Sequence, residues 1–229
     1  METRARYLII AAAGKSDRSG TNIPKQYAII NNKPVLIHII EAFLTHLELE
    51  NMVIAISNNH IDYWQKLKKN YPELEKVNMV IGGPERFHSI KAALKLIPDN
   101  AVVAIHDGAR PLIDQYTINE CFTTALNKGS AIPVVDSTDS LRMADGLENK
   151  SLNRKHIKRV QTPQTFKSEL IKKAYNTNYR DNFTDDASVF EFASNSVFLC
   201  KGNSENLKIT SKYDFALASI ILQDRDLSS

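Results

Sequence analysis

The chain has 229 residues, of which 43% are hydrophobic and 24% are charged, and its formal net charge is +3. These values are ordinary for a soluble globular protein, and the length suits one domain over residues 1–229 that needs no covalent staples. The small net charge argues against a nucleic-acid partner. The longest basic run is Lys66-Leu67-Lys68-Lys69, and it fits the solvated face of a helix.

Cysteine content and hydropathy restrict the location and the partners of the protein. Cys121 and Cys200 are the two cysteines, and no CxxC motif is present, so we expect neither a structural disulfide nor a zinc site. No apolar run reaches membrane-spanning length, and the N-terminus lacks the pattern of a signal peptide. We therefore expect a cytoplasmic protein with no membrane partner.

Strand and helix patterns alternate along most of the chain. A continuous apolar run at 7–13 predicts a strand buried on both faces. Further strands are expected at 26–30, 52–56, 77–81, 102–105, 131–135, 197–200 and 207–209. Apolar residues at helical spacing predict helices after Pro34, at 61–70, around 90–97 and 118–126, and at 167–179, 185–192 and 213–223. Such alternation is typical of an α/β protein with a mostly parallel, doubly wound, twisted sheet and helices on both faces.

Residues 136–158 break this alternation. They are polar, contain the turn Ala144-Asp145-Gly146, and show no core periodicity of their own. The segment is too long for an ordinary connection in a compact domain. We expect a strand pair that projects as an arm, with a disordered loop as the alternative.

Glycines mark the ends of the predicted strands. The glycines that follow a strand are Gly14, Gly20, Gly82, Gly83 and Gly108. In an open parallel sheet, ligands bind in the crevice beyond the carboxyl ends of the strands. The loops after the strands at 7–13, 77–81 and 102–105 are therefore expected to converge on one site.

The loop after the first strand has the composition of an anion-binding loop. Gly14 and Gly20 let backbone N–H groups face an anion closely, and Arg18 and Lys25 add two cations. The loop matches neither the P-loop pattern nor the dinucleotide fingerprint. Nucleotidyl transfer builds negative charge on the phosphates, which fixed cations would stabilise. A pair of solvated surface cations is the alternative.

The loop after the strand at 102–105 offers a carboxylate and a further cation. Asp107, at a strand end and followed by glycine, suits a Mg²⁺ that also grips substrate phosphates. Arg110 could bind a second phosphate bidentately. An internal ion pair between Asp107 and Arg110 at a turn is the alternative. In the second loop, Ser89 either caps the following helix or hydrogen-bonds a base or ribose.

The second half of the chain adds polar groups with less certain roles. Arg154 and Thr162 flank the return of the arm, and Lys208 lies on the short strand at 207–209, which is expected to re-enter the site. The segment 184–188 predicts a helix N-cap followed by acids in the first helical turn.

Motifs along nearly the whole chain resemble those of one family. In chain order they are AAAGKSDRSG, PKQY, GGPERFHS, HDGARP, TDSLR, QTPQTF, TDDAS and NLKIT. The set resembles the 2-C-methyl-D-erythritol 4-phosphate cytidylyltransferase family of the non-mevalonate isoprenoid pathway, and PKQY with HDGARP and TPQ is a specific combination. The resemblance implies a single Rossmann-like nucleotidyltransferase domain that uses CTP, a polyol phosphate and Mg²⁺. It also implies a homodimer with composite active sites.

The resemblance assigns a role to each matching residue. Arg18 and Lys25 would stabilise the transition state, and Asp107 would hold Mg²⁺. The residues that would bind CTP are Ala12, Ala13, Gly14, Gly82, Gly83 and Ser89. Those that would bind the acceptor are Asp107, Arg110, Ser140, Arg154, Thr162 and Lys208. Arg154 and Lys208 would also serve catalysis, and Ser140, Arg154 and Thr162 would reach in from the partner chain.

The chain departs from the family pattern in the first loop, and rival functions stay open. Ser16 stands where the family has glycine, and Asp17 introduces an acid, which could weaken triphosphate binding. The nearest rival is a cytidylyltransferase for ribitol 5-phosphate. A nucleotide-sugar glycosyltransferase is disfavoured because the only DxD motif, Asp224-Arg225-Asp226, follows a helix rather than a strand. A non-catalytic nucleotide-binding module would not need Arg18, Lys25 and Asp107 together.

Overall fold

A computed structural model describes residues 4–14 and 23–227, and at its centre lies an eight-stranded sheet. The strands follow the order β10-β7-β11-β6-β1-β4-β5, and β12 pairs with β7 beside this path. Their bounds are β1 (Arg6–Ala12), β4 (Met52–Ile56), β5 (Asn78–Ile81), β6 (Val102–Asp107), β7 (Ser130–Asp136), β10 (Lys158–Val160), β11 (Gln164–Lys167) and β12 (Leu199–Lys201). The pairs β6-β1, β1-β4, β4-β5 and β7-β12 are parallel, as expected.

The central strands are buried on both faces, as their uninterrupted apolar sequences predict. Every residue of β4 and of β6 is buried, including the polar His106 and Asp107 at the end of β6. Alternate side chains of β1 enter two separate hydrophobic clusters. Leu8 and Ile10 pack on one face of the sheet and Ile9 on the other.

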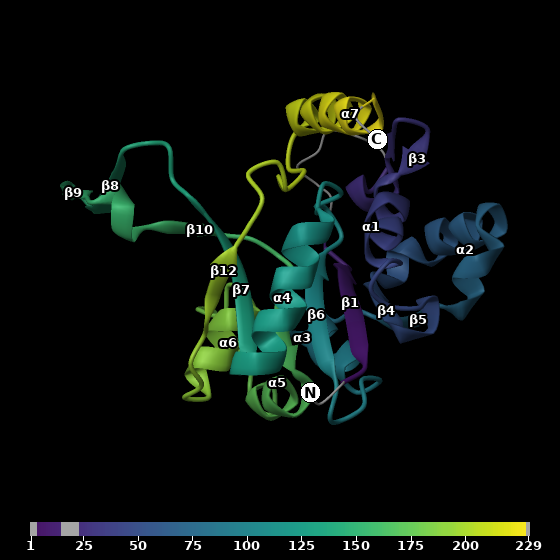
Figure 1. Cartoon of the computed structure of the whole chain (residues 1–229), viewed down its shortest axis with the longest axis horizontal. Coiled ribbons are helices and arrows are strands. Elements are labelled where there is room, and N and C mark those ends of the chain that lie inside the picture. Colours follow the sequence, from purple (N-terminus) through teal and green to yellow (C-terminus); the bar gives the residue numbers. More distant parts are fainter. Residues whose placement is uncertain (1–3, 15–22, 228–229) are drawn as a thin grey trace.

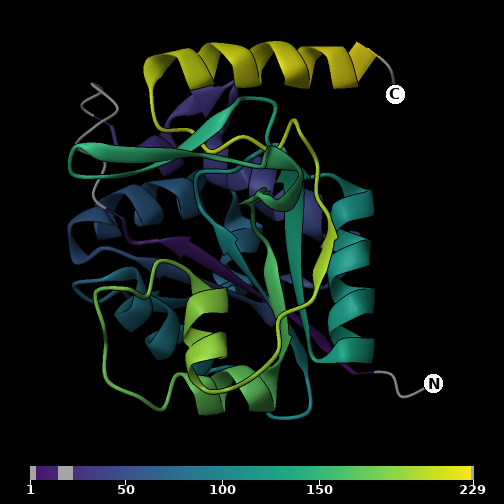
Figure 2. The same ribbon diagram turned by 90° about the vertical axis from the view of Figure 1, so that its left-hand side faces the viewer.

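Helices cover both faces of the sheet, which confirms the expected fold class (Figures 1 and 2). The cluster that contains Leu8 and Ile10 is completed by residues of α1 (Val35–Phe43), α2 (Ile61–Asn70), α4 (Gln115–Lys128) and α7 (Lys212–Leu227). The cluster that contains Ile9 is completed by residues of α3 (Arg86–Leu94), α5 (Ser168–Ala174) and α6 (Asp186–Phe192). In Figure 1, α7 lies across the top of the molecule.

The structure corrects the prediction of a strand at 26–30. A 3₁₀ turn, η1 (Lys25–Tyr27), takes its first part, and only β2 (Ile29–Ile30) remains, paired with β3 (Lys33–Pro34). The turn forms because the Tyr27 N–H donates to the Pro24 carbonyl oxygen at 2.8 Å, and the Gln26 amide donates to the Ala12 carbonyl oxygen at 2.8 Å. These bonds hold the segment against the end of β1 instead of in a ladder.

Two further predictions in the second half are corrected, one in the end of a helix and one in the presence of a strand. The predicted helix at 167–179 is preceded by an unexpected strand, β11, which is antiparallel to both β6 and β7, and α5 ends at Ala174. Residues 207–209 form no strand; one backbone bond, from Ile209 N–H to the Ala109 carbonyl oxygen at 2.8 Å, brings them to the end of β6. Both features depend on long-range pairing that local sequence patterns do not carry.

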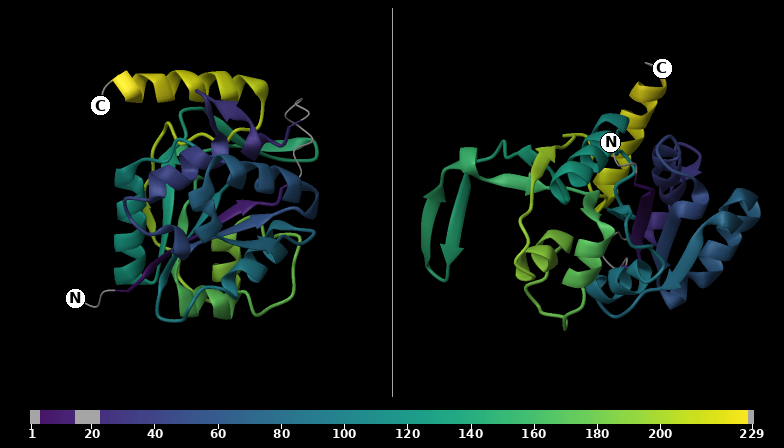
Figure 3. Two further views of the ribbon diagram at one scale, coloured as in Figure 1. Left: turned by 90° about the vertical axis from the view of Figure 1, so that its right-hand side faces the viewer. Right: turned by 60° about the horizontal axis from the view of Figure 1, so that its bottom comes forward.

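The polar segment at 136–158 contains the expected strand pair. β8 (Leu141–Asp145) and β9 (Glu148–Leu152) pair antiparallel, and the turn between them includes Gly146 at a φ of +56°. The short helix η5 (Arg154–His156) follows. Figure 3 (right) shows the hairpin standing away from the body of the molecule, so the alternative of a disordered loop was wrong.

The two cysteines, distant in sequence, lie in contact between α4 and β12. Their sulfur atoms are 3.6 Å apart, and both are free thiols. Within the described ranges 4–14 and 23–227, no helix is long and apolar enough to span a membrane.

Candidate active site

The order of the strands creates a crevice at one edge of the sheet. The chain runs from β1 outward through β4 to β5 and then returns to β6 on the other side of β1. Such a reversal opens a ligand-binding crevice beyond the carboxyl ends of the two diverging strands. A pocket of about 520 Å³ lies there. Its lining consists of residues 11–14, 83–86 and 107–109 with Lys25, Gln26, Ser57, Asn59, Ser89, Lys208 and Thr210.

Glycines allow the loops around the pocket to pack closely. A Cβ atom on Gly82 would lie 2.4 Å from the Cβ of Ala13, and one on Gly108 would lie 3.0 Å from the Ala11 carbonyl oxygen. Any side chain at Gly82 would therefore push the second loop away from the first. The sequence thus brings the backbones of three loops within reach of one ligand.

Ser89 holds the second loop from behind. It does not cap α3, because Glu85 is the N-cap residue and Ser89 lies inside the helix. Its hydroxyl donates to the Glu85 carbonyl oxygen at 3.2 Å and accepts from the Gly83 N–H at 3.2 Å. Of the two alternatives for Ser89, capping was wrong, and the hydroxyl fixes the loop 83–85 against the helix.

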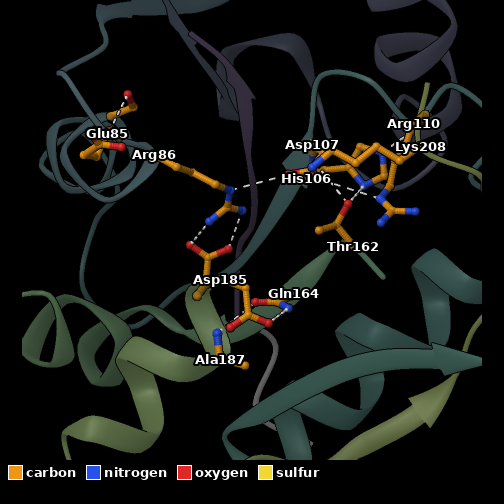
Figure 4. Close-up of polar contacts among 12 residues, drawn as sticks. Glu85, Arg86, His106, Asp107, Arg110, Thr162, Gln164, Asp185, Ala187 and Lys208 are labelled. Carbon is orange, nitrogen blue, oxygen red and sulfur yellow. Dashed lines mark hydrogen bonds and ion pairs between the residues drawn. The ribbon is translucent and has the colours of Figure 1, made fainter. Parts of the chain in front are cut away.

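Asp107 lies at the centre of the charged part of the site (Figure 4). Its carboxylate, 12% exposed, lies 2.9 Å from Lys208 Nζ, 3.4 Å from Arg86 Nε and 3.6 Å from Arg110 Nε. Burial raises the pKa of Asp107, but the charges of Arg86, Lys208 and Arg110 outweigh burial and hold the pKa well below its usual range. The side chain is therefore a carboxylate at neutral pH. The internal Asp107–Arg110 ion pair, which the sequence offers as an alternative to metal binding, is present, and it is the longest of the three contacts between Asp107 and these cations.

A chain of hydrogen bonds fixes the backbone under Asp107. The Asp107 N–H donates to the Thr162 hydroxyl at 3.1 Å, and that hydroxyl lies 3.1 Å from His106 Nδ1. His106 Nε2 lies 2.9 Å from the Arg110 carbonyl oxygen, which can only accept, so Nε2 carries the proton and Nδ1 accepts from Thr162. Burial lowers the pKa of His106 from 6.5 to about 4, which keeps the ring neutral.

Arg110 braces the segment that carries Lys208. Its Nη1 donates to the Asn206 carbonyl oxygen at 2.8 Å, and the Asn206 amide donates to the Thr162 carbonyl oxygen at 2.9 Å. Asn206 is fully buried, so these bonds are protected from water. They hold the extended residues before α7 in place and deliver Lys208 to Asp107.

Comparison with known proteins shows the family to which the chain belongs. Residues 7–224 match the profile of the family described as 2-C-methyl-D-erythritol 4-phosphate cytidylyltransferase. The curated protein of that name from Porphyromonas gingivalis is 39% identical, and the alignment spans 95% of this chain and 97% of that protein. The one from Bacteroides fragilis is 38% identical, over 95% of this chain and 99% of that protein. The crystal structure of the Francisella tularensis protein of that name has a TM-score of 0.76 at 28% identity, over 94% of this chain and 99% of that one. The chain belongs to this family.

Membership of the 2-C-methyl-D-erythritol 4-phosphate cytidylyltransferase family confirms the resemblance found in the motifs, and the chain is a nucleotidyltransferase. Several residues matched to the family pattern lie together in the pocket. They are Ala12, Ala13, Gly14, Lys25, Gly83, Ser89, Asp107 and Lys208. Gly82, Arg110 and Thr162 stand directly behind this lining through the contacts described above. The resemblance implies that Thr162 reaches in from the partner chain, but its buried hydroxyl contacts Asp107 of its own chain. Arg18 and Gly20 lie outside the described residues.

Two residues matched to the family's acceptor site lie outside the pocket of their own chain. Ser140 and Arg154 are exposed at the base of the β8–β9 arm, and neither lines the pocket of its own chain. The Arg154 guanidinium donates to the Thr138 carbonyl oxygen at 2.5 Å, which holds it at the start of the arm.

Sequence reasoning missed Gln26 and Arg86, which also line the pocket. Gln26 is buried and ties Lys25 to the end of β1 through its amide. Arg86 is the first residue of α3, directly after the glycine loop, and this position beside a predicted phosphate site is the feature that could have identified it.

The carboxylates near the pocket do not form a complete metal cage. Within residues 4–14 and 23–227, no three His, Cys, Asp or Glu side chains cluster as metal ligands would. Mg²⁺, however, is commonly held by one or two carboxylates together with substrate phosphates. Asp107, at the end of β6 in the pocket, offers one carboxylate of that kind.

The lowered pKa of His106 predicts a pH dependence of stability. Between pH 6.5 and about 4, the unfolded chain protonates this histidine and the folded chain does not, so the free energy of unfolding falls as the pH falls through this window. One such proton contributes a slope of up to about 1.4 kcal/mol per pH unit. Asp107 contributes below its ordinary pKa of 3.8, outside this window.

Urea unfolding of the wild type and of His106→Gln between pH 4.5 and 7.5 measures this slope. We expect His106→Gln to lose about one proton's worth of the slope. A His106→Gln protein with an unchanged slope would contradict the assignment of a buried neutral ring.

Proposed function

We propose that this chain transfers the cytidylyl group of CTP to the phosphate of 2-C-methyl-D-erythritol 4-phosphate and releases pyrophosphate, a step of non-mevalonate isoprenoid synthesis. The relatives that bear the name of this activity support the proposal. The observation that carries it is the convergence of Lys25, Asp107 and Lys208 on a glycine-walled pocket at the switch point of the sheet.

The reaction is a direct displacement. An oxygen of the acceptor phosphate attacks the α-phosphorus of CTP in line, the bond to the bridging oxygen breaks, and pyrophosphate leaves. The attacking group is already anionic, so no protein nucleophile is required. The enzyme's contribution is to orient the two substrates and to place fixed positive charge, from Lys25 and Lys208, where negative charge develops.

Asp107 is the residue that would hold Mg²⁺. Bound there together with the triphosphate, the ion would neutralise phosphate charge and favour departure of pyrophosphate. Lys208 now contacts the same carboxylate at 2.9 Å, so its ammonium would turn toward the phosphates when the metal takes that oxygen.

The exposed arm supports a homodimer with composite sites. Leu147 at its tip is fully exposed and Met143 is 49% exposed, an apolar surface that water disfavours and that a second copy would cover. Ser140 and Arg154 stand at its base, away from the pocket of their own chain. In a two-fold dimer the arm would carry these polar groups to the acceptor side of the partner's pocket.

The free thiols Cys121 and Cys200 suit a reducing cytoplasm, where we propose the enzyme works.

Among the rivals, ribitol 5-phosphate as acceptor is the closest, because it presents the same phosphate nucleophile. A glycosyltransferase stays disfavoured, because residues 224–226 lie within α7 rather than after a strand. A non-catalytic nucleotide-binding module would not need Lys25 and Asp107 together in one pocket.

Release of pyrophosphate with different substrates tests the function. We expect turnover with CTP and 2-C-methyl-D-erythritol 4-phosphate, and at least about 10²-fold lower kcat/KM with ATP or GTP, since a site that hydrogen-bonds a base edge rejects bases lacking the matching groups. Ribitol 5-phosphate and glycerol 3-phosphate serve as competing acceptors. Equal rates with all three nucleotides would contradict the assignment, and a preference for ribitol 5-phosphate would identify the rival.

Subunit mixing tests the composite site. Lys25→Ala alone is expected to lower kcat by roughly 10²-fold, the size typical for loss of one preorganised charge contact. In a dimer of a Lys25→Ala chain with an Arg154→Ala chain, one site carries both changes and the other neither. An equimolar mixture after exchange should then recover about a quarter of wild-type activity, since half the dimers are mixed and each has one intact site.

Native mass spectrometry verifies the exchange. A mixture that stays as inactive as its parents, with mixed dimers present, would show that each chain builds its own site.

A further inference from the structure

Two consecutive acids at the start of α6 have different roles. Asp185 is the N-cap, as the sequence predicts: its carboxylate accepts from the Ser188 N–H at 2.9 Å in a capping box. Its other oxygen accepts from the Gln164 amide at 2.7 Å. Asp186 takes no part in the cap and points toward the pocket side of the domain. Helix capping therefore leaves Asp186 unexplained.

Asp186 is fully buried and binds both ends of the Arg86 guanidinium. Its two oxygens accept from Arg86 Nη1 at 2.8 Å and Nη2 at 2.6 Å, and the Tyr175 hydroxyl donates to the same carboxylate at 2.6 Å. A bidentate pair of this kind is among the strongest and most directional polar contacts in proteins. A second contact supports it: the ring of Phe87, next to Arg86, stacks on Tyr175 with centroids 4.8 Å apart.

This engagement determines how Arg86 meets Asp107. Both terminal nitrogens of Arg86 are on Asp186. Arg86 therefore presents its Nε to Asp107 Oδ1, at 3.4 Å, and Figure 4 shows this contact between Arg86 and Asp107. Charge-assisted N–H···O bonds measure about 2.7–2.9 Å, so this contact is electrostatic and loose. Arg86 thereby lends positive charge to the pocket without closing over the carboxylate.

We propose that Asp186 is a positioning residue that occupies the terminal nitrogens of Arg86 and so keeps Asp107 open to a divalent cation. The inference rests on the proposed function of Asp107 as the Mg²⁺ ligand. Without Asp186, the guanidinium of Arg86 is free to turn onto Asp107, which it already contacts through Nε. A bidentate Arg86–Asp107 pair would then compete with the cation for the same oxygens.

Because the freed Arg86 would compete with the cation for Asp107, a second substitution at Arg86 should reverse the effect of Asp186→Asn. Asp186→Asn leaves Arg86 free to capture Asp107, so a higher Mg²⁺ concentration is needed to support nucleotide binding. Arg86→Gln in the same chain removes the competitor, and the Mg²⁺ requirement returns. A residue that only stabilises the fold would show no such rescue, because the second change removes a further contact.

Calorimetric titration of CTP at a series of Mg²⁺ concentrations, without acceptor, measures this requirement. We expect Asp186→Asn to raise the half-saturating Mg²⁺ concentration by about tenfold or more, the equivalent of one charge-assisted contact. The double variant Arg86→Gln/Asp186→Asn should return to within about twofold of wild type. Ser188→Ala is the matched control: it removes the Ser188 part of the α6 capping box, lowers stability and leaves the Mg²⁺ requirement unchanged.

The outcomes separate this inference from the function on which it rests. Wild-type protein that binds no CTP at any Mg²⁺ concentration overturns both. Wild-type binding with an Asp186→Asn requirement equal to that of Ser188→Ala overturns the inference alone, as does a double variant that stays as impaired as the single one. If Asp186→Asn does not fold, Tyr175→Phe decides the matter. It keeps the ring but loses the hydroxyl that orients Asp186, so the requirement should rise about twofold, and an unchanged value overturns the inference.

Discussion

A nearly buried carboxylate surrounded by cations organises the active site. Asp107 ends a fully buried strand, so its charge has little water and must be compensated by protein. Compensation comes from three parts of the chain: Arg86 from the start of α3, Arg110 from the loop after β6, and Lys208 from the segment before α7. Each cation holds its own segment at the pocket. The carboxylate thus draws together loops that are far apart in sequence.

The sheet makes this arrangement possible by placing β1 beside β6. Both strands are buried on both faces, which leaves their carboxyl ends as the first place where polar backbone can meet a ligand. Gly82 and Gly108 let the neighbouring loops approach without side chains between them. Below Asp107, the neutral ring of His106 and the hydroxyl of Thr162 satisfy buried polar groups in a fixed order. These hydrogen bonds fix the base of the pocket, and loops line the rest of it.

Much of this could be predicted from local sequence, and the failures share a cause. The apolar runs at 77–81 and 102–105 predicted strands that the structure contains, and the glycines after them predicted where the site lies. The strand predicted at 26–30 was wrong because the Gln26 amide reaches back to β1, a contact that no local pattern reveals. β11 was missed because it is antiparallel and pairs with strands distant in sequence.

The same limit applied to the site residues. Asp107 and Lys25 were predicted because each sits at a strand end or in a glycine-flanked loop. Asp186 was hidden because an acid in the first turn of a helix already has a local explanation, and its partner Arg86 is 100 residues away. Ser140 and Arg154 match the family's acceptor-site pattern in sequence, but both lie outside the pocket of their own chain.

A crystal structure of the protein with CTP and Mg²⁺ would test the account most directly. The account predicts the triphosphate in the pocket between residues 11–14 and 107–109, with Mg²⁺ at about 2.1 Å from a carboxylate oxygen of Asp107 and from phosphate oxygens. Arg86 should remain on Asp186. A triphosphate bound elsewhere on the molecule, with Asp107 still paired to Lys208 and no metal at its carboxylate, would contradict it.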